Sequence, residues 1–122
     1  MEFHKNKPIY IQIVDIIAQK IVLKEWNDNT KIPTIKDLAK SLNVNHNTLM
    51  RSLEFLQAKN ILVSKRGVGL FLTKEAYNNS LELMRQMFYK DQVPEFFDTM
   101  YTLKITLGEL IDLYKTNKKD VR

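Results

Sequence analysis

The sequence predicts a mainly α-helical protein that carries one small β-hairpin. Three observations support this fold class. Apolar residues recur at every third or fourth position through the first half of the chain, two short runs of β-forming residues follow, and helical periodicity then returns. The expected order of elements is therefore three helices, a hairpin and further helices.

The first helix is expected over residues 8–24, where isoleucines such as Ile13 and Ile17 fall on one face. Pro8 suits its first turn, because a residue at that position needs no N–H group. A polar stretch with turn-forming residues follows. Trp26 is the single large aromatic residue in this stretch, and we expect it to anchor the loop.

The second and third helices are expected to be short and to follow each other closely. The second spans roughly residues 35–42 and starts after Thr34, whose hydroxyl can cap the free N–H groups. The third covers residues 46–59, with Asn45 as its cap. Three apolar side chains of the third helix are expected to face inward, namely Leu49, Leu53 and Leu56.

Two β-prone runs come directly after the third helix, at residues 61–64 and 68–72. They are joined by Lys65, Arg66 and Gly67, so they are expected to form a hairpin with a basic tip.

The rest of the chain is expected to be helical. One helix starts near Lys74 and ends before Pro94, and a second segment starts near Phe96. Thr106 and Glu109 have the spacing of a capping box, which predicts the start of a last helix.

The positive charge of the chain is concentrated in its first part. The net charge is +5, all of it within residues 1–73, while residues 74–122 are neutral. A polyanionic partner would therefore bind the first part. Charge alone does not decide the matter, because a surface charge of this size also keeps a small protein soluble.

Composition disfavours several functional classes. No apolar run approaches the roughly 20 residues that cross a bilayer, and the first residues lack the apolar core of a secretory signal, so a cytoplasmic location is expected. The chain has no cysteine, which excludes disulfides and thiolate sites. His4 and His46 are its only histidines, and no carboxylate pair or nucleophile motif appears. The sequence therefore predicts no enzyme, no cofactor and no metal site.

Two short helices joined by a turn of three or four residues form a helix-turn-helix, which places its second helix in the major groove of DNA. The outward positions in the first turns of that helix are expected to be His46, Asn47, Met50 and Arg51. Asparagine can bind adenine, and arginine can bind guanine, through two hydrogen bonds each. Asn47, Thr48 and Arg51 therefore suit base or phosphate contacts. The solvated face of an ordinary three-helix bundle would show the same pattern.

The hairpin favours the DNA-binding interpretation. Lys65, Arg66 and Gly67 follow the third helix where a wing would straddle the DNA backbone and displace counterions from its phosphates. A tight hairpin can also carry surface lysines without such a role. We predict a winged helix-turn-helix domain over residues 1–73 and a helical dimerisation region over residues 74–122.

Four segments taken together resemble the GntR family of transcriptional regulators. They are PIYIQI at residues 8–13, IPTIKDLA at 32–39, LNVNHNTL at 42–49 and GVGLFL at 67–72. The resemblance covers about residues 8–73. It implies a winged-helix domain that contacts operator DNA through the start of the second helix, the recognition helix and the wing tip. The matching positions are Lys36, Asn45, His46, Asn47, Thr48, Arg51, Arg66 and Gly67.

Three positions depart from the family pattern. Where the family usually has arginine, this chain has Met50 and Lys36, and the threonine of the wing is Leu70. Lysine and methionine lack the forked guanidinium that reads guanine. The base preference of the family is therefore not carried over to this chain. Arg51, next to Met50, can compensate in part for the missing guanidinium.

The C-terminal region is most similar to the small YtrA-type branch of the family, which implies a dimeric repressor with a tail of two or three helices. This region has more apolar surface than short helices bury alone, so a second chain is expected to complete its core. Packing of the same side chains against residues 9–24 of one chain is the alternative. The residues expected at the dimer interface are Leu81, Met84, Phe88, Phe96, Phe97, Met100, Tyr101, Leu103 and Leu107.

The sequence as a whole predicts a DNA-binding transcription regulator that represses as a homodimer on an inverted-repeat operator. The alternative is a winged-helix protein-interaction module, which would show no salt-sensitive binding to DNA. The operator sequence and the binding of a small-molecule effector stay open, and no membrane contact is expected.

Overall fold

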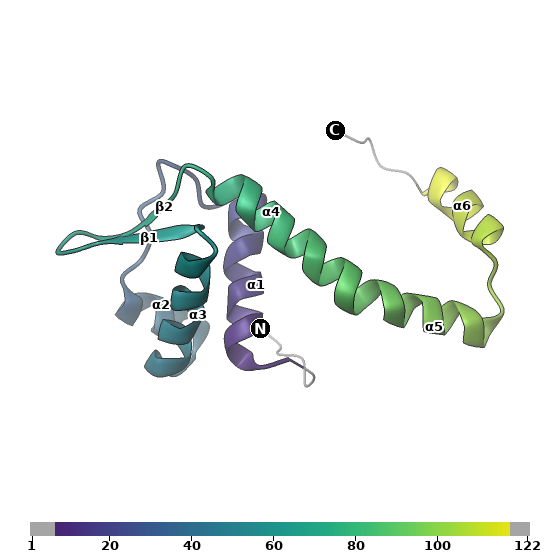
Figure 1. The fold of residues 1–122 in the computed structure, drawn as a ribbon, viewed down its shortest axis with the longest axis horizontal. Coiled ribbons are helices and arrows are strands. Elements are labelled where there is room, and N and C mark those ends of the chain that lie inside the picture. The colour runs from purple at the N-terminus through teal and green to yellow at the C-terminus, as the bar shows by residue number, and fades with distance from the viewer. Residues whose placement is uncertain (1–6, 118–122) are drawn as a thin grey trace. The chain divides into compact units, whose positions relative to one another are not determined.

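The computed structural model describes residues 7–117 (Figure 1). They form two compact units, of which the first ends at Arg85 and the second begins at Gln86. The elements in chain order are α1 (Ile9–Val22), α2 (Ile35–Leu42), α3 (His46–Ala58), β1 (Leu62–Lys65), β2 (Gly69–Leu72), α4 (Ala76–Met87), the π-helix η1 (Phe88–Gln92), α5 (Val93–Leu103) and α6 (Leu107–Thr116). The structure confirms the predicted class of a mostly helical chain with one hairpin.

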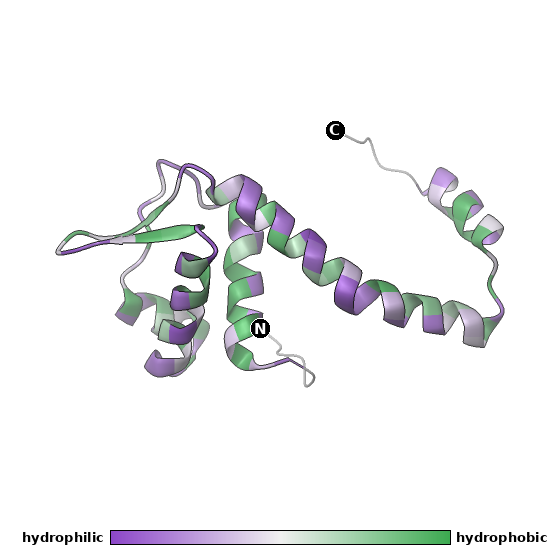
Figure 2. Cartoon of the chain, in the orientation of Figure 1, coloured by the Kyte–Doolittle hydropathy of each residue, from purple (hydrophilic) through white to green (hydrophobic). Residues whose placement is uncertain are grey.

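Helices α1 and α3 pack against each other at the centre of the first unit, and α2 packs on α3. Figure 2 shows that hydrophobic residues predominate along α1. The predicted inward faces are confirmed, and Trp26 is buried as expected. The large apolar side chains that these two helices bury are Ile13, Val14, Ile17 and Ile21 of α1 and Leu49, Leu53 and Leu56 of α3.

Side-chain caps fix the ends of the helices that form the helix-turn-helix. The hydroxyl of Thr34 accepts a hydrogen bond from the Asp37 N–H at 3.1 Å, and Asn45 Oδ1 accepts one from the Asn47 N–H at 2.7 Å. Between the two helices Asn43 adopts a left-handed conformation with φ 54°, which ends α2. Both caps are as predicted, and together they set the point at which α3 begins.

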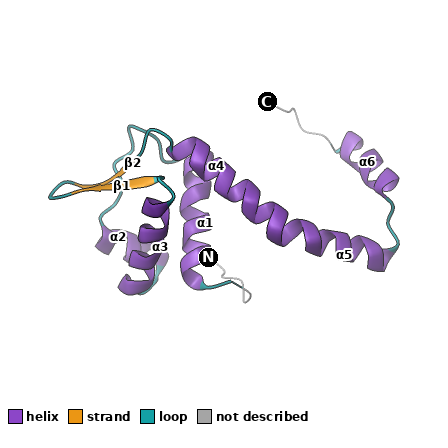
Figure 3. Ribbon diagram, in the orientation of Figure 1, coloured by secondary structure: helices purple, strands orange, loops and turns teal. Residues whose placement is uncertain are grey.

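The two strands form an antiparallel hairpin, drawn in orange in Figure 3. Leu62 pairs with Leu72 at the open end of the hairpin, and Lys65 pairs with Gly69 next to the turn. Gly67 has φ 77°, a backbone conformation that residues other than glycine rarely adopt, so a glycine suits this turn. Lys65 is the last residue of β1, so the turn itself consists of residues 66–68.

The first unit continues past the hairpin into α4. Ala76 and Ser80 on this helix are buried, and the Asn79 side chain donates hydrogen bonds to the carbonyls of Lys59 and Asn60 at 3.2 and 3.1 Å. The start of α4 is therefore tied to the end of α3. The functional division after residue 73 stays a prediction.

Ser80 is fully buried, and its hydroxyl has no hydrogen-bond partner within the described residues. A buried hydroxyl without a partner has lost its hydrogen bonds to water and gained none. We expect Ser80→Ala to raise the free energy of unfolding by about 1 kcal/mol.

Ser52 provides the matched contrast, because its buried hydroxyl lies 2.9 Å from the Tyr10 carbonyl oxygen and 3.0 Å from that of Thr48. Ser52→Ala should lower the free energy of unfolding, since it leaves a buried acceptor without its donor. Urea unfolding at one fixed protein concentration measures both variants. A lower midpoint for Ser80→Ala would contradict the assignment.

The sequence prediction of a helix that ends before Pro94 was wrong. The chain stays helical from α4 through η1 into α5, and Pro94 lies in the first turn of α5. A proline ring clashes with the carbonyl four residues earlier in an α-helix, and here that residue, Lys90, lies within the wider π-helical turn. The turn accommodates the proline without a break.

The second unit has helices but no buried core among its described residues. The predicted cap of its last helix is confirmed, because the Thr106 hydroxyl accepts a hydrogen bond from the Glu109 N–H at 3.2 Å. Lys104 ends α5 in a left-handed conformation with φ 56°. Within residues 7–117, no helix has the length and apolar character that a membrane span requires.

Candidate nucleic-acid interface

The first turns of α3 present a polar surface. His46, Asn47 and Arg51 are exposed, and Thr48 is half-buried. Met50 was predicted to face outward, but it is half-buried and packs against the core. The outward face of α3 therefore consists of polar side chains, and its first turn contains no acidic residue.

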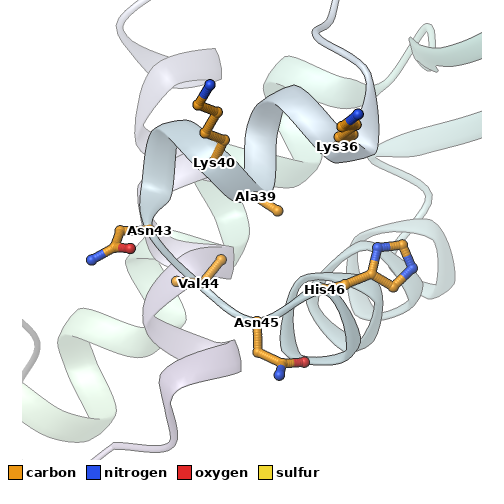
Figure 4. A pocket seen from close by; sticks show the side chains of 7 residues that line it. All are labelled: Lys36, Ala39, Lys40, Asn43, Val44, Asn45 and His46. Atoms are coloured by element: carbon orange, nitrogen blue, oxygen red, sulfur yellow. The ribbon is translucent and has the colours of Figure 1, made fainter.

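A shallow recess of about 530 Å³ lies between α2 and the start of α3. Figure 4 shows its lining, with Lys36 and Lys40 on α2, Asn45 at the cap and His46 on the first turn of α3. Asn45 uses its oxygen for the cap, so its amide N–H groups stay available to an acceptor. Two ammonium groups, an imidazole and two side-chain amides thus border one recess.

Arg51 is held by an aromatic ring from α1. Its guanidinium carbon lies 3.9 Å from the centroid of the Tyr10 ring. The Tyr10 ring in turn meets the Phe55 ring edge-on, with centroids 6.5 Å apart and planes at 63°. Arg51 therefore has a defined position on the surface, although its side chain is exposed.

The hairpin supplies the remaining cations. Lys65, Arg66 and Gly67 are all exposed. The Lys65 ammonium lies 4.5 Å from the centroid of the Phe71 ring, on the opposite strand. In Figure 1 the turn of the hairpin extends beyond the helices of its unit.

The cations at these places have no acidic partner among residues 7–117. Within the part of the chain that the structure describes, no ion pair engages Lys36, Lys40, Arg51, Lys65 or Arg66. In Figure 1 helices α2 and α3 and the hairpin all lie on one side of α1. Such unpaired cations on one unit form a field that attracts polyanions.

Two features of this surface were not found from the sequence. Lys40 borders the recess, and its place four residues after Lys36 on a helix could have indicated it. Tyr10 lies far from Arg51 in the sequence, and no local pattern links the two residues.

Comparison with known proteins agrees with this geometry. Residues 9–72 match the gntR family of bacterial regulatory proteins. The HTH-type transcriptional regulator YhcF of Bacillus subtilis (strain 168) is 29% identical over 94% of this chain and 93% of its own length. The HTH-type transcriptional repressor YtrA of the same organism is 24% identical over 96% of this chain and 89% of its own.

A solved structure shows the same fold over nearly the whole chain. A GntR family transcriptional regulator from Listeria monocytogenes has a TM-score of 0.71 and 29% identity, over 95% of this chain and 100% of that one. The family match begins at the first residue of α1 and ends at the last residue of β2, so it spans the three helices and the hairpin. Since it covers more than half of the sequence, this chain belongs to the GntR family of bacterial regulatory proteins and is a transcriptional regulator with a winged helix-turn-helix domain.

Proposed function

We propose that this regulator acts as a homodimer that represses transcription by covering an inverted-repeat operator. Two α3 helices would enter successive major grooves, roughly 34 Å apart. One observation carries the proposal, namely the acid-free polar face at the start of α3 beside cations that have no ion pair within the described residues.

The side chains of α3 suit base contacts. Asn47 and Arg51 are four residues apart, so they share one face of the helix, and both are exposed. An amide matches adenine and a guanidinium matches guanine, each through paired hydrogen bonds. Thr48 and His46 extend the same end of the helix with further polar groups.

The surrounding groups suit phosphate contacts. Lys36 and Asn45 border the recess between α2 and α3, where the N-terminal N–H groups of α3 favour an anion. Lys65, Arg66 and the backbone of Gly67 would hold the adjacent phosphates. Contacts of this kind fix the register of a protein on DNA, and they carry no sequence information themselves.

The second unit supports a dimer. Phe88, Phe96, Phe97 and Tyr101 are between 47% and 85% exposed, and Leu107 is 67% exposed. A surface with this many large apolar side chains favours association, and a second copy offers the same surface in return. On α4, Leu81 is 36% exposed and Met84 is half-buried. We propose that these side chains, Met100 and Leu103 form the interface.

Salt dependence tests the DNA contact. Binding to a random-sequence duplex should weaken steeply between about 50 and 200 mM salt, because protein cations release counterions from phosphates. Lys65→Ala and Arg66→Ala should each reduce the slope of log affinity against log salt by about one. Fluorescence anisotropy across a salt series measures this slope.

Lys115→Ala is the matched control, because it removes the same charge from the last turn of α6. Its slope should equal that of the unsubstituted protein. A chain that binds duplex DNA without salt sensitivity, or not at all, would instead be a protein-interaction module built on the winged-helix fold. A cytoplasmic location is part of the proposal, since a chromosomal operator lies in that compartment.

A further inference from the structure

The guanidinium of Arg51 lies over the ring of Tyr10, and Tyr10 is itself bound to α3. The Tyr10 carbonyl accepts a hydrogen bond from the Ser52 hydroxyl at 2.9 Å, although the two residues are 42 positions apart. Phe55 contacts the Tyr10 ring from the side. Tyr10 is therefore held by the two residues of α3 that lie one and four positions after Arg51.

This arrangement restricts Arg51 without occupying its donors. The N–H groups of a guanidinium point outward in its own plane, so a ring against one face leaves them open to an acceptor. The described residues give Arg51 no ion pair that would compete for those donors. A long side chain that is already ordered loses less conformational entropy when it binds.

We infer that Tyr10 is a positioning residue, which holds Arg51 in the conformation that reads a base pair. The inference rests on the proposed function, because it assigns a task to a residue outside the recognition helix. Tyr10 contributes its ring to this task, while its hydroxyl group contributes nothing to it. The fit of α1 to α3 at Tyr10 would then influence which operator is preferred.

A double-mutant cycle separates this role from mere folding. The probes are a duplex that the unsubstituted protein selects from a random pool and a scrambled duplex of the same composition. Tyr10→Leu should weaken binding to the selected duplex by about three- to tenfold, with binding to the scrambled duplex nearly unchanged. In an Arg51→Ala background, the same substitution should cause no further loss.

Two further variants make the test specific. Tyr10→Phe keeps the ring and should bind the selected duplex within about twofold of the unsubstituted protein. Tyr77→Leu is the matched control, because Tyr77 also carries a cation, with the Lys24 ammonium 5.2 Å from its ring centroid. It should leave both affinities unchanged. Circular dichroism sets an assay temperature at which every variant is folded.

The outcomes distinguish the inference from the function on which it rests. Equal losses for Tyr10→Leu with and without Arg51 would overturn it, and so would a Tyr10→Phe variant as weak as Tyr10→Leu. The second result would mean that the phenol hydroxyl binds DNA directly. If the unsubstituted protein selects no duplex from the pool, the proposed function itself fails.

Discussion

Phe97→Asp should convert the protein into a monomer and weaken operator binding by about a hundredfold or more. Phe97 is 53% exposed on α5, so the substitution removes little from the fold of a single chain. In a dimer the same position would place two carboxylates inside an apolar interface, where burial of an unpaired charge is costly. Each half-site would then bind alone, without the gain of about 10² to 10⁴ that linked binding provides.

Light scattering at several protein concentrations measures the oligomeric state, and anisotropy with one or two half-sites measures affinity. Thr102→Asp is the matched control, because it adds the same charge to an exposed position of α5 on the side away from Phe97 and Met100. It should stay dimeric. A dimeric Phe97→Asp with unchanged affinity would place the interface elsewhere on the chain.

Arg51→Ala should weaken binding to the selected duplex by about 1–3 kcal/mol and relax the preference at one base pair. The loss arises because a paired hydrogen-bond acceptor on guanine would be left without its donor. Binding to the scrambled duplex should change much less, since phosphate contacts account for most of that affinity. Selection from a random pool with the variant shows which position is relaxed.

Lys59→Ala is a demanding control for this result. Like Arg51, Lys59 is a cation next to an aromatic ring, with its ammonium 5.6 Å from the centroid of the Phe55 ring. It differs from Arg51 in lying at the C-terminal end of α3. It should leave base preference intact. If Arg51→Ala lost equal affinity for both duplexes, Arg51 would be a phosphate contact and Asn47 would be the remaining candidate for base reading.

Local sequence signals account for most of the first unit. The apolar stripes of α1 and α3 predict which faces are buried, and Thr34 and Asn45 predict where two helices begin. These signals work because caps and stripes depend on residues within a few positions of each other. The hairpin could be predicted from equally local signals, since Gly67 lies between two short β-forming runs.

The details that sequence reasoning missed depend on contacts between distant segments. Met50 falls on the outward side of a helical wheel, yet it is partly buried and packs against the core. Ser52 is buried, although serine is a residue type usually found at the surface. The Ser52 hydroxyl is satisfied by a carbonyl of α1, which no pattern within α3 could reveal. Pro94 was misjudged because helix-breaking rules assume an α-helical turn before the proline.

The winged unit completes its own core by Arg85, while the described helices beyond it bury none of their side chains. In the proposed dimer, substitutions on the outer surface of α3 would therefore accumulate without disturbing the contacts between the two chains. Substitutions at the proposed interface on α5 or α6 would likewise change which chains pair, while α3 stays unchanged. Duplicated copies of such a gene could diverge in target or in pairing independently, which would let related regulators coexist in one cell without forming mixed assemblies.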